Sequence, residues 1–407
     1  MSNSPKSDGW LAFRSPDFRF FFISRFLSSF SAMMIDVGVG WMVYAMTDST
    51  FAIGLVGLFS FAPNIIFMLA VGHAADRYDR RRVLIICYIG NMLASAGLIL
   101  CALTPGVEVS IVYGLVLLFG TARAFANPAS QALLPMIVPR EAFSSALAWN
   151  SSTWQVASIT GPALTGLAYL VGPHLVFIIT TLSYIACTIL LFAIKPRLAA
   201  AAHEPVTWHT LTAGWRFIWA KPAVLGSISV DLFAVLLGGA TALLPAYAKE
   251  VFHTGSLGLG ILTCMPAVGA LTCSVIIART GVGGRCGEKM FGAVAIFGLA
   301  TVGFGLSTNI YLAGFFLIIA GFVDMVSVQI RQMLVQLETP DAMRGRVSAV
   351  NGIFIGASNE LGAFESGALA ALTGPVAAVV LGGVGSVAVA AIWSRLFPEL
   401  RKRDRLE

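Results

Sequence analysis

The chain has 407 residues, of which 57% are hydrophobic and 11% are charged, and its formal net charge is +6. A water-exposed surface of the usual kind needs roughly a quarter of all residues to be charged, so this composition excludes a soluble globular protein. We expect most of the surface to face lipid. The positive charge then needs no nucleic acid, because basic residues orient membrane proteins and contact anionic lipid head groups.

Apolar segments long enough to cross a bilayer recur along the whole chain. A helix rises 1.5 Å per residue, so a hydrocarbon core of ~30 Å takes about 20 apolar residues. The predicted fold class is therefore an all-α membrane protein with twelve transmembrane helices. We predict them at residues 18–46, 51–73, 83–104, 108–130, 143–171, 174–194, 223–248, 256–279, 289–307, 310–335, 347–372 and 375–396.

The breaks between these spans differ in charge. If the amino terminus is cytoplasmic, 22 of the 26 Lys and Arg residues fall in cytoplasmic segments, three (Arg25, Arg123 and Arg331) fall within spans, and only Lys249 faces outward. The positive-inside rule then places both termini in the cytoplasm. A helix over residues 208–219, lying on the membrane surface, would fit the longest polar connection. The predicted organisation is a cytoplasmic segment 1–17, a six-helix bundle 18–194, a cytoplasmic linker 195–222, a second six-helix bundle 223–396 and a basic cytoplasmic tail 397–407.

An internal repeat supports two related halves. The segment that begins at Leu133 aligns without gaps with the segment that begins at Leu334, and Asn150 then meets Asn351. Tyr44 similarly meets Tyr247 at nearly the same offset. Parallel six-helix repeats of this kind build transporters that rock around a site at the middle of the membrane.

The connection between the second and third spans reads GHAADRYDRRR from Gly72. It resembles the loop signature of the major facilitator superfamily, G-x-L-A-D-R-x-G-R-[RK]-x, although Ala74 and Asp79 depart from it. An acidic side chain there can face the positive end of a neighbouring helix and pair with arginines. A basic anchor without any gating role is the alternative. The residues expected to form a cytoplasmic gate are Gly72, Asp76, Arg77, Arg80 and Arg81.

The fifth span contains GPALTG from Gly161. This resembles the antiporter signature G-x-x-x-G-P-x-x-G-G of the same superfamily, with Ala157 and Thr165 in place of two glycines. Gly161, Pro162 and Gly166 would permit close helix packing and a bend. A role in packing alone is the alternative to a role in antiport.

Four longer segments resemble one branch of that superfamily. They are DVGVGWMVY from Asp36, ADRYDRRR from Ala75, RAFANPASQALLP from Arg123 and RGRVSAVNGIFIGASNELGAFESG from Arg344. Together they are similar to the enterobactin-exporter-like branch, also called the transmembrane secretion effector family, which includes siderophore and drug exporters. The resemblance implies two pseudo-symmetric six-helix bundles and the export of siderophore-like or drug-like molecules.

Ionisable residues inside spans are costly in lipid and are therefore candidates for function. A carboxylic acid in a low-dielectric cavity binds a proton more readily. We expect Asp36, Glu360 or both to couple export to proton entry, with Arg123 opposing protonation of the acid that approaches it. An interhelical ion pair is the alternative for each residue. The candidates for proton coupling or for cavity charges are Asp36, Arg123, Asp231, Asp324, Arg331 and Glu360.

Amide and indole side chains in the spans are expected to orient a polar or aromatic substrate, and packing is their alternative role. The expected cavity-lining residues are Trp41, Asn127, Gln131, Gln155 and Asn359.

The predicted function is proton-coupled export with alternating access in a bacterial inner membrane. The sequence lacks the nucleotide-binding pattern G-x-x-x-x-G-K-[ST], so a gradient is expected to supply the energy. We expect no enzymatic activity, cofactor, metal, nucleotide or nucleic acid, and a monomer that binds small molecules, protons and lipid. An importer or facilitator on the same fold is one alternative function. A nontransporting membrane receptor or assembly factor is the other.

Overall fold

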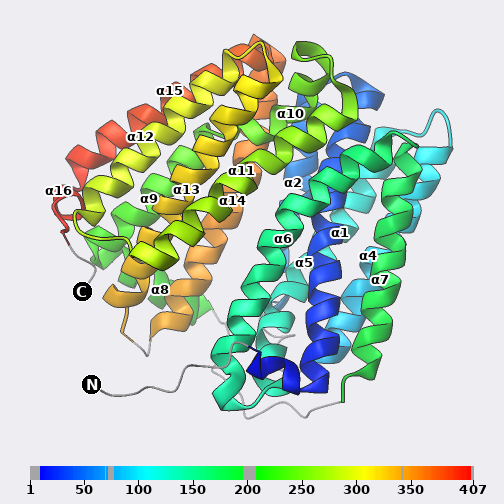
Figure 1. Ribbon diagram of the computed structural model, residues 1–407, viewed down its shortest axis with the longest axis horizontal. Coiled ribbons are helices and arrows are strands. Elements are labelled where there is room, and N and C mark those ends of the chain that lie inside the picture. The colour runs from blue at the N-terminus through cyan, green and yellow to red at the C-terminus, as the bar shows by residue number, and fades with distance from the viewer. Residues whose placement is uncertain (1–9, 69, 72–77, 196–207, 341–342, 405–407) are drawn as a thin grey trace. The chain divides into compact units, whose positions relative to one another are not determined.

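The computed structural model describes residues 10–68, 70–71, 78–195, 208–340 and 343–404. Every regular element in these ranges is helical (Figure 1), so the prediction of an all-α protein is confirmed. The longer helices are α1 (Pro16–Thr47), α2 (Thr50–Ile66), α4 (Arg80–Leu103), α5 (Val109–Ile137), α6 (Phe143–Tyr169), α7 (Pro173–Ala193), α8 (Trp208–Ala220), α9 (Pro222–Leu237), α11 (Gly255–Thr280), α12 (Cys286–Gly305), α13 (Ile310–Glu338), α14 (Arg344–Thr373) and α15 (Pro375–Leu396). The short ones are η1 (Leu11–Arg14), η2 (Arg140–Ala142), η3 (Ala240–Leu243), α10 (Leu244–Ala246), η4 (Tyr247–Val251) and α16 (Pro398–Arg401).

Nine helices of the described residues are long and apolar enough to cross a membrane. They are α1, α4, α5, α7, the run from Pro222 to Val251, α11, α12, α13 and α15. Helix α2 is apolar but has 17 residues, whereas α6 and α14 have ample length but a more polar composition. The count of twelve spans therefore stays a prediction.

The helices pack into two compact units. One consists of Met1–Gly38 and Ala62–Pro205, and the other of Val39–Phe61 and Val206–Glu407. In the first unit α4 packs against both α5 and α7. In the second unit α13 packs against α11 and α12, α12 packs against α15, and α9 packs against α14 and α15. The division into two six-helix bundles stays a prediction.

Prolines and glycines mark many of the helix ends. Helices α7, α9 and α15 begin at prolines, whose fixed φ suits the first helical turn and whose missing N–H is not needed there. Helices α11 and α14 end at Gly281 and Gly374, which have φ angles of +70° and +86°. Glycine adopts this left-handed conformation without steric cost, so both helices stop sharply.

The helix boundaries repeat between the halves. Helices α5 and α13 both have 29 residues. Their first residues stand at the same offset as Leu133 and Leu334, and so do the first residues of α6 and α14. The offset found in the sequence alignment thus also relates two consecutive helices of the first half, α5 and α6, to α13 and α14 of the second half.

The predicted span 223–248 is interrupted at Gly238 and Gly239. After this break the chain continues through η3 and α10 into η4, which is a π-helical turn. A Cβ atom on Gly239 would meet the Gly362 oxygen of α14 at 2.7 Å, and one on Gly238 would meet the Ser386 hydroxyl of α15 at 2.8 Å. The glycine pair therefore lets two neighbouring helices approach the backbone at the break.

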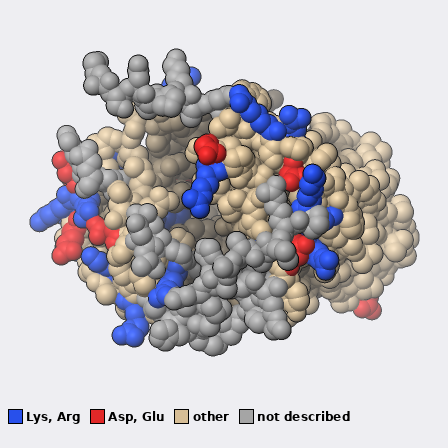
Figure 2. Space-filling view, turned by 90° about the horizontal axis from the view of Figure 1, so that it is seen from below, with Lys and Arg blue, Asp and Glu red and all other residues tan. Residues whose placement is uncertain are grey.

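The helix expected over residues 208–219 is observed as α8. It packs on α14, where the Trp215 ring stacks on Phe354 with centroids 5.2 Å apart. Its place on the membrane surface stays a prediction. Figure 2 shows Lys and Arg side chains spread over one face of the protein, with Asp and Glu side chains between them.

Close packing of α11 on α13 gives a first testable prediction. A Cβ atom on Gly321 would meet the Pro266 Cα atom at 2.6 Å, which is shorter than real Cβ contacts. We expect Gly321→Ala to lower the free energy of unfolding by about 1–3 kcal/mol, the usual cost of overpacking. The measurement is the Tm of the purified protein in detergent.

The matched control is Gly292→Ala on α12, because no heavy atom lies within 4 Å of the added Cβ atom. This variant should keep or slightly raise the Tm, since alanine favours helix over glycine. Equal Tm values for the two variants would contradict the contact.

Candidate functional site

An ion pair joins two apolar helices of the first unit. Arg123 Nη1 of α5 lies 3.5 Å from Asp36 Oδ2 of α1. The Asp36 side chain is 39% exposed and the Arg123 side chain 27% exposed. Charged groups in apolar helices are rarely tolerated against lipid, so an accessible pair of this kind is suited to a water-filled path. The pairing brings together two of the predicted site residues.

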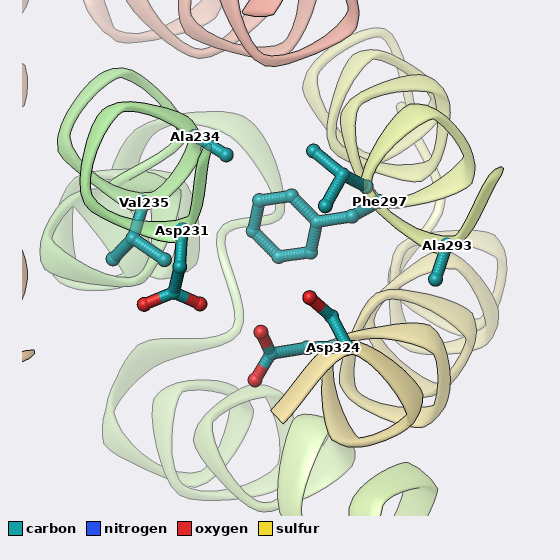
Figure 3. A pocket seen from close by; sticks show the side chains of 8 residues that line it. Asp231, Ala234, Val235, Ala293, Phe297 and Asp324 are labelled. Carbon is teal, nitrogen blue, oxygen red and sulfur yellow. The ribbon is translucent and has the colours of Figure 1, made fainter. Parts of the chain in front are cut away.

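A second charged cluster lies in the second unit. Arg331 of α13 forms an ion pair with Asp231 of α9, and their side chains are only 3% and 8% exposed. Asp324 stands two turns before Arg331 on the same face of α13. Figure 3 shows the carboxylates of Asp231 and Asp324 pointing into the same space, with Phe297 across it. Three more of the predicted residues are therefore neighbours.

These carboxylates line a small cavity, which we call the α9–α13 cavity. Its accessible volume is about 10 Å³, which is about the space that one water molecule needs. Ser327 Oγ is buried and makes no hydrogen bond within the described residues. The lining residues are Asp231, Ala234, Val235, Ala293, Val294, Phe297, Asp324 and Ser327.

Glu360, the other predicted coupling residue, lies on α14 beside α2. Its Oε2 atom is 3.3 Å from the point where a Cβ atom on Gly57 would stand. Glycine at this position of α2 therefore leaves room for the carboxylate. Both residues belong to the second unit.

The predicted cavity-lining amides and indole are only partly buried or exposed. Gln131 and Asn359 are exposed, whereas Trp41, Asn127 and Gln155 are intermediate. The α9–α13 cavity is lined by other residues. Contact between a substrate and the five predicted cavity-lining residues stays a prediction.

The predicted cytoplasmic gate is described only in part, since Gly72, Asp76 and Arg77 lie outside the described residues. Arg80 Nη1 lies 3.3 Å from the Met136 sulfur. Arg81 donates hydrogen bonds to the carbonyl oxygens of Leu191 and Phe192, at 2.7 and 2.9 Å. A guanidinium group at this place satisfies the last carbonyls of α7 and its dipole.

Asp79 has a role that the sequence comparison did not assign. Its carboxylate accepts a hydrogen bond from the Arg81 backbone N–H at 2.9 Å and so caps the start of α4. Aspartate is a preferred N-cap residue. The position of Asp79 directly before the apolar helix could have indicated an N-cap. In the sequence analysis, Asp79 was only a departure from the loop signature.

The glycines of the fifth predicted span pack α6 against α1. A Cβ atom on Gly161 would meet Met33 Cβ at 2.6 Å and the Phe30 carbonyl oxygen at 3.2 Å. The Thr165 hydroxyl donates to the Gly161 carbonyl oxygen at 2.9 Å. These contacts favour a packing role for Gly161, whereas the roles of Pro162 and Gly166 stay predictions.

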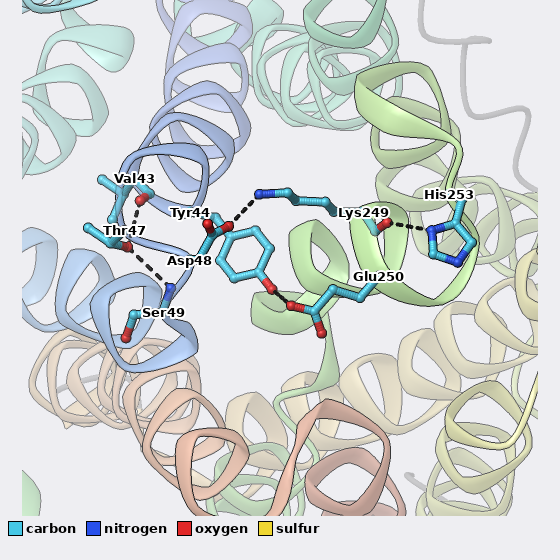
Figure 4. Close-up of polar contacts among 8 residues, drawn as sticks. All are labelled: Val43, Tyr44, Thr47, Asp48, Ser49, Lys249, Glu250 and His253. Carbon is cyan, nitrogen blue, oxygen red and sulfur yellow. Dashed lines mark hydrogen bonds and ion pairs between the residues drawn. The ribbon is translucent and has the colours of Figure 1, made fainter. Parts of the chain in front are cut away.

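Four residues that the sequence analysis did not connect form a polar group, the Lys249 cluster. The Tyr44 hydroxyl donates to the Glu250 carboxylate, and Lys249 forms an ion pair with Asp48 (Figure 4). The Lys249 ammonium group also lies 5.3 Å from the centroid of the Tyr44 ring, a cation–π distance. The cluster ties the end of α1 to the π-helical turn η4 within the second unit.

Residues 7–406 match the sequence pattern of the transmembrane secretion effectors. The chain belongs to this family. The family is a branch of the major facilitator superfamily of membrane transporters, so the predicted family is confirmed. The enterobactin exporter EntS of Citrobacter koseri is 27% identical to this secretion effector over 397 residues, which cover 95% of this chain and 93% of the exporter. EntS of Escherichia coli O127:H6 is also 27% identical, over 401 residues with the same coverage.

Solved structures share the fold of this secretion effector. A POT family transporter in complex with 5-aminolevulinic acid has a TM-score of 0.74 at 11% identity, covering 95% of this chain and 97% of its own. A bacterial homologue of the lysosomal transporter Spinster has a TM-score of 0.72 at 13% identity, with coverages of 94% and 97%. The nucleoside transporter NupG has a TM-score of 0.70 at 15% identity, with coverages of 94% and 99%. The secretion effector is a multi-pass membrane transporter, and not an enzyme.

Proposed function

We propose that this secretion effector exports siderophore-like or drug-like small molecules across the bacterial inner membrane in exchange for protons. The observation that carries the proposal is the Asp36–Arg123 ion pair, which is accessible although it lies within apolar helices. The relatives named enterobactin exporter support export as the direction and a siderophore as one substrate class.

Exchange of substrate for protons follows if the proton and the substrate compete for binding at the Asp36–Arg123 ion pair. Protonation neutralises Asp36 and so weakens its attraction for the Arg123 guanidinium, which changes the charge that a substrate meets. A substrate that requires the ionised pair binds only after the proton has left. Alternating access then carries a proton inward and a substrate outward in successive half-cycles.

The membrane arrangement is part of the same proposal. We assign twelve spans in two bundles, 18–194 and 223–396, with both termini in the cytoplasm and a monomeric chain without cofactor. Helices α6 and α14 occupy equivalent places in the repeat, and neither is among the nine candidate spans. This shared property supports spans that are shielded from lipid. The Lys and Arg side chains on the face in Figure 2 suit a cytoplasmic surface.

Transport into inverted inner-membrane vesicles tests the function. Respiration acidifies the vesicle interior, so an exporter that exchanges protons should accumulate enterobactin or ethidium inside. Each exchanged proton supports a concentration ratio of up to about tenfold per pH unit. The measurement is the substrate content of the vesicles before and after nigericin collapses the pH gradient.

Vesicles from cells that lack the transporter are the control. Accumulation that needs the transporter and disappears with nigericin supports proton-coupled export. Depletion of preloaded substrate under the same gradient would indicate an importer. Saturable binding without any response to the gradient would indicate a receptor.

A further inference from the structure

We propose that the α9–α13 cavity binds one proton on Asp324, with the Asp231–Arg331 ion pair as its fixed countercharge. Two carboxylates and one guanidinium group meet at this place, so the fully ionised cluster carries one excess negative charge. Uncompensated charge is expensive in a buried site. Binding a single positive charge removes it.

Arg331 is committed to Asp231, which leaves Asp324 as the carboxylate that lacks a counterion. Within the described residues, the ion pairs of the second unit include Arg331 with Asp231 but none with Asp324. Within the part of the chain that the structure describes, the ionisable groups near Asp324 are Asp231 from α9, Arg331 from its own helix and the Cys273 thiol of α11. Helix α12 contributes only Ala293, Val294 and Phe297 to the cavity, and these are apolar.

The unsatisfied Ser327 hydroxyl points to an occupant in the cavity. Ser327 is 2% exposed, lines the cavity, and its Oγ atom makes no hydrogen bond within the described residues. Buried hydroxyl groups normally have a partner. A water molecule in the cavity would hydrogen-bond both Ser327 and the protonated Asp324.

The size of the cavity favours a proton over a metal ion. Hard metal ions such as Ca²⁺ and Mg²⁺ take six or more oxygen ligands, but this cavity has room for about one water molecule. A divalent metal ion would also bring two positive charges to a cluster that has one excess negative charge. A proton needs neither a ligand shell nor extra volume. The inference rests on the proposed function only for what the proton does during transport.

Infrared difference spectroscopy of the purified protein between high and low pH tests the site directly. The wild-type spectrum should contain a C=O stretching band of a buried protonated carboxylic acid. Asp324→Asn should lose this band component, whereas Asp36→Asn should keep it. Asp231→Asn should also lose it although Asp324 remains, because Arg331 then compensates Asp324 and keeps it ionised.

The Tm of each variant shows whether it is folded. Asp324→Asn should be at least as stable as the wild type, since the neutral amide, like the protonated acid, leaves the cluster without excess charge. Persistence of the complete band in folded Asp324→Asn would overturn the assignment, and its removal from the wild type by sodium ions at constant pH would identify a metal site instead. The band needs no transport, so a negative vesicle assay with the expected infrared result would refute antiport while leaving the proton site standing.

Discussion

Replacing Arg331 by methionine is expected to lower the free energy of unfolding by about 3–5 kcal/mol, the cost of breaking a buried ion pair by removing one partner. The side chains of Arg331 and Asp231 are almost fully buried, so the loss of the guanidinium group strands a carboxylate away from water. Asp324 in the same cavity is also acidic and cannot replace the lost countercharge of Asp231. The measurement is the Tm of the purified protein in detergent, together with the yield of monodisperse protein.

A partly exposed ion pair of the same unit provides the matched control. Arg403 pairs with Glu338 at 2.5 Å, but its side chain is accessible to water. Arg403→Met should cost no more than about 1 kcal/mol, as exposed pairs usually do. The double variant Arg331→Met with Asp231→Asn should recover much of the lost stability. Equal Tm losses in Arg331→Met and Arg403→Met would refute the importance of burial.

The second large effect is expected on transport. Asp36→Asn should reduce pH-driven uptake into inverted vesicles to the level of vesicles without the transporter, because an amide cannot release and rebind a proton. Glu360→Gln tests the second predicted coupling residue in the same way. The measurement is the initial rate of uptake at matched amounts of membrane-inserted protein.

Asp48→Asn in the Lys249 cluster is the control for the loss of a carboxylate. Asp48 is well exposed and pairs with Lys249 near the end of α1, so this variant should keep most of the uptake rate. If Asp36→Asn and Glu360→Gln both still drive uptake, neither residue carries the coupled proton, and Asp324 becomes the main candidate.

The sequence predicted the helical class because lipid dictates both the length and the composition of a spanning helix. The same reasoning could not foresee the interruption at Gly238 and Gly239. A glycine pair is compatible with an apolar helix, and it breaks this one where α14 and α15 approach the backbone. The hydropathy of a segment indicates whether it faces lipid or water, but it does not show which helices pack against the segment.

The charged residues of the spans were selected as candidates from the sequence, but the sequence did not predict which of them form ion pairs. The repeat aligns Arg123 with Asp324, which relates their positions in the two halves and says nothing of contact. Asp231 pairs with Arg331 because α9 and α13 turn these faces toward each other. Residue type and spacing do not show how one helix is rotated against another. The pairing of Asp231 with Arg331 could therefore be recognised only in the structure.

The Lys249 cluster shows the same limit over a longer distance. Tyr44 and Glu250 lie 206 residues apart in the chain, and each is unremarkable where it stands. Their hydrogen bond depends on the π-helical turn η4, which has no sequence signature of its own. The opposite charges of Asp48 and Lys249, both predicted outside the spans, were the one available hint.

The Asp231–Arg331 pair also has a consequence for how the chain is made. Arg331 leaves the ribosome about 100 residues after Asp231, which corresponds to roughly 5–20 s at ordinary rates of synthesis. During that interval α9 must enter the membrane with an acidic residue whose partner does not yet exist, at an insertion cost of about 2.5–3.5 kcal/mol if it lies centrally. The surrounding leucine, valine and isoleucine residues of α9 offset that cost until α13 arrives.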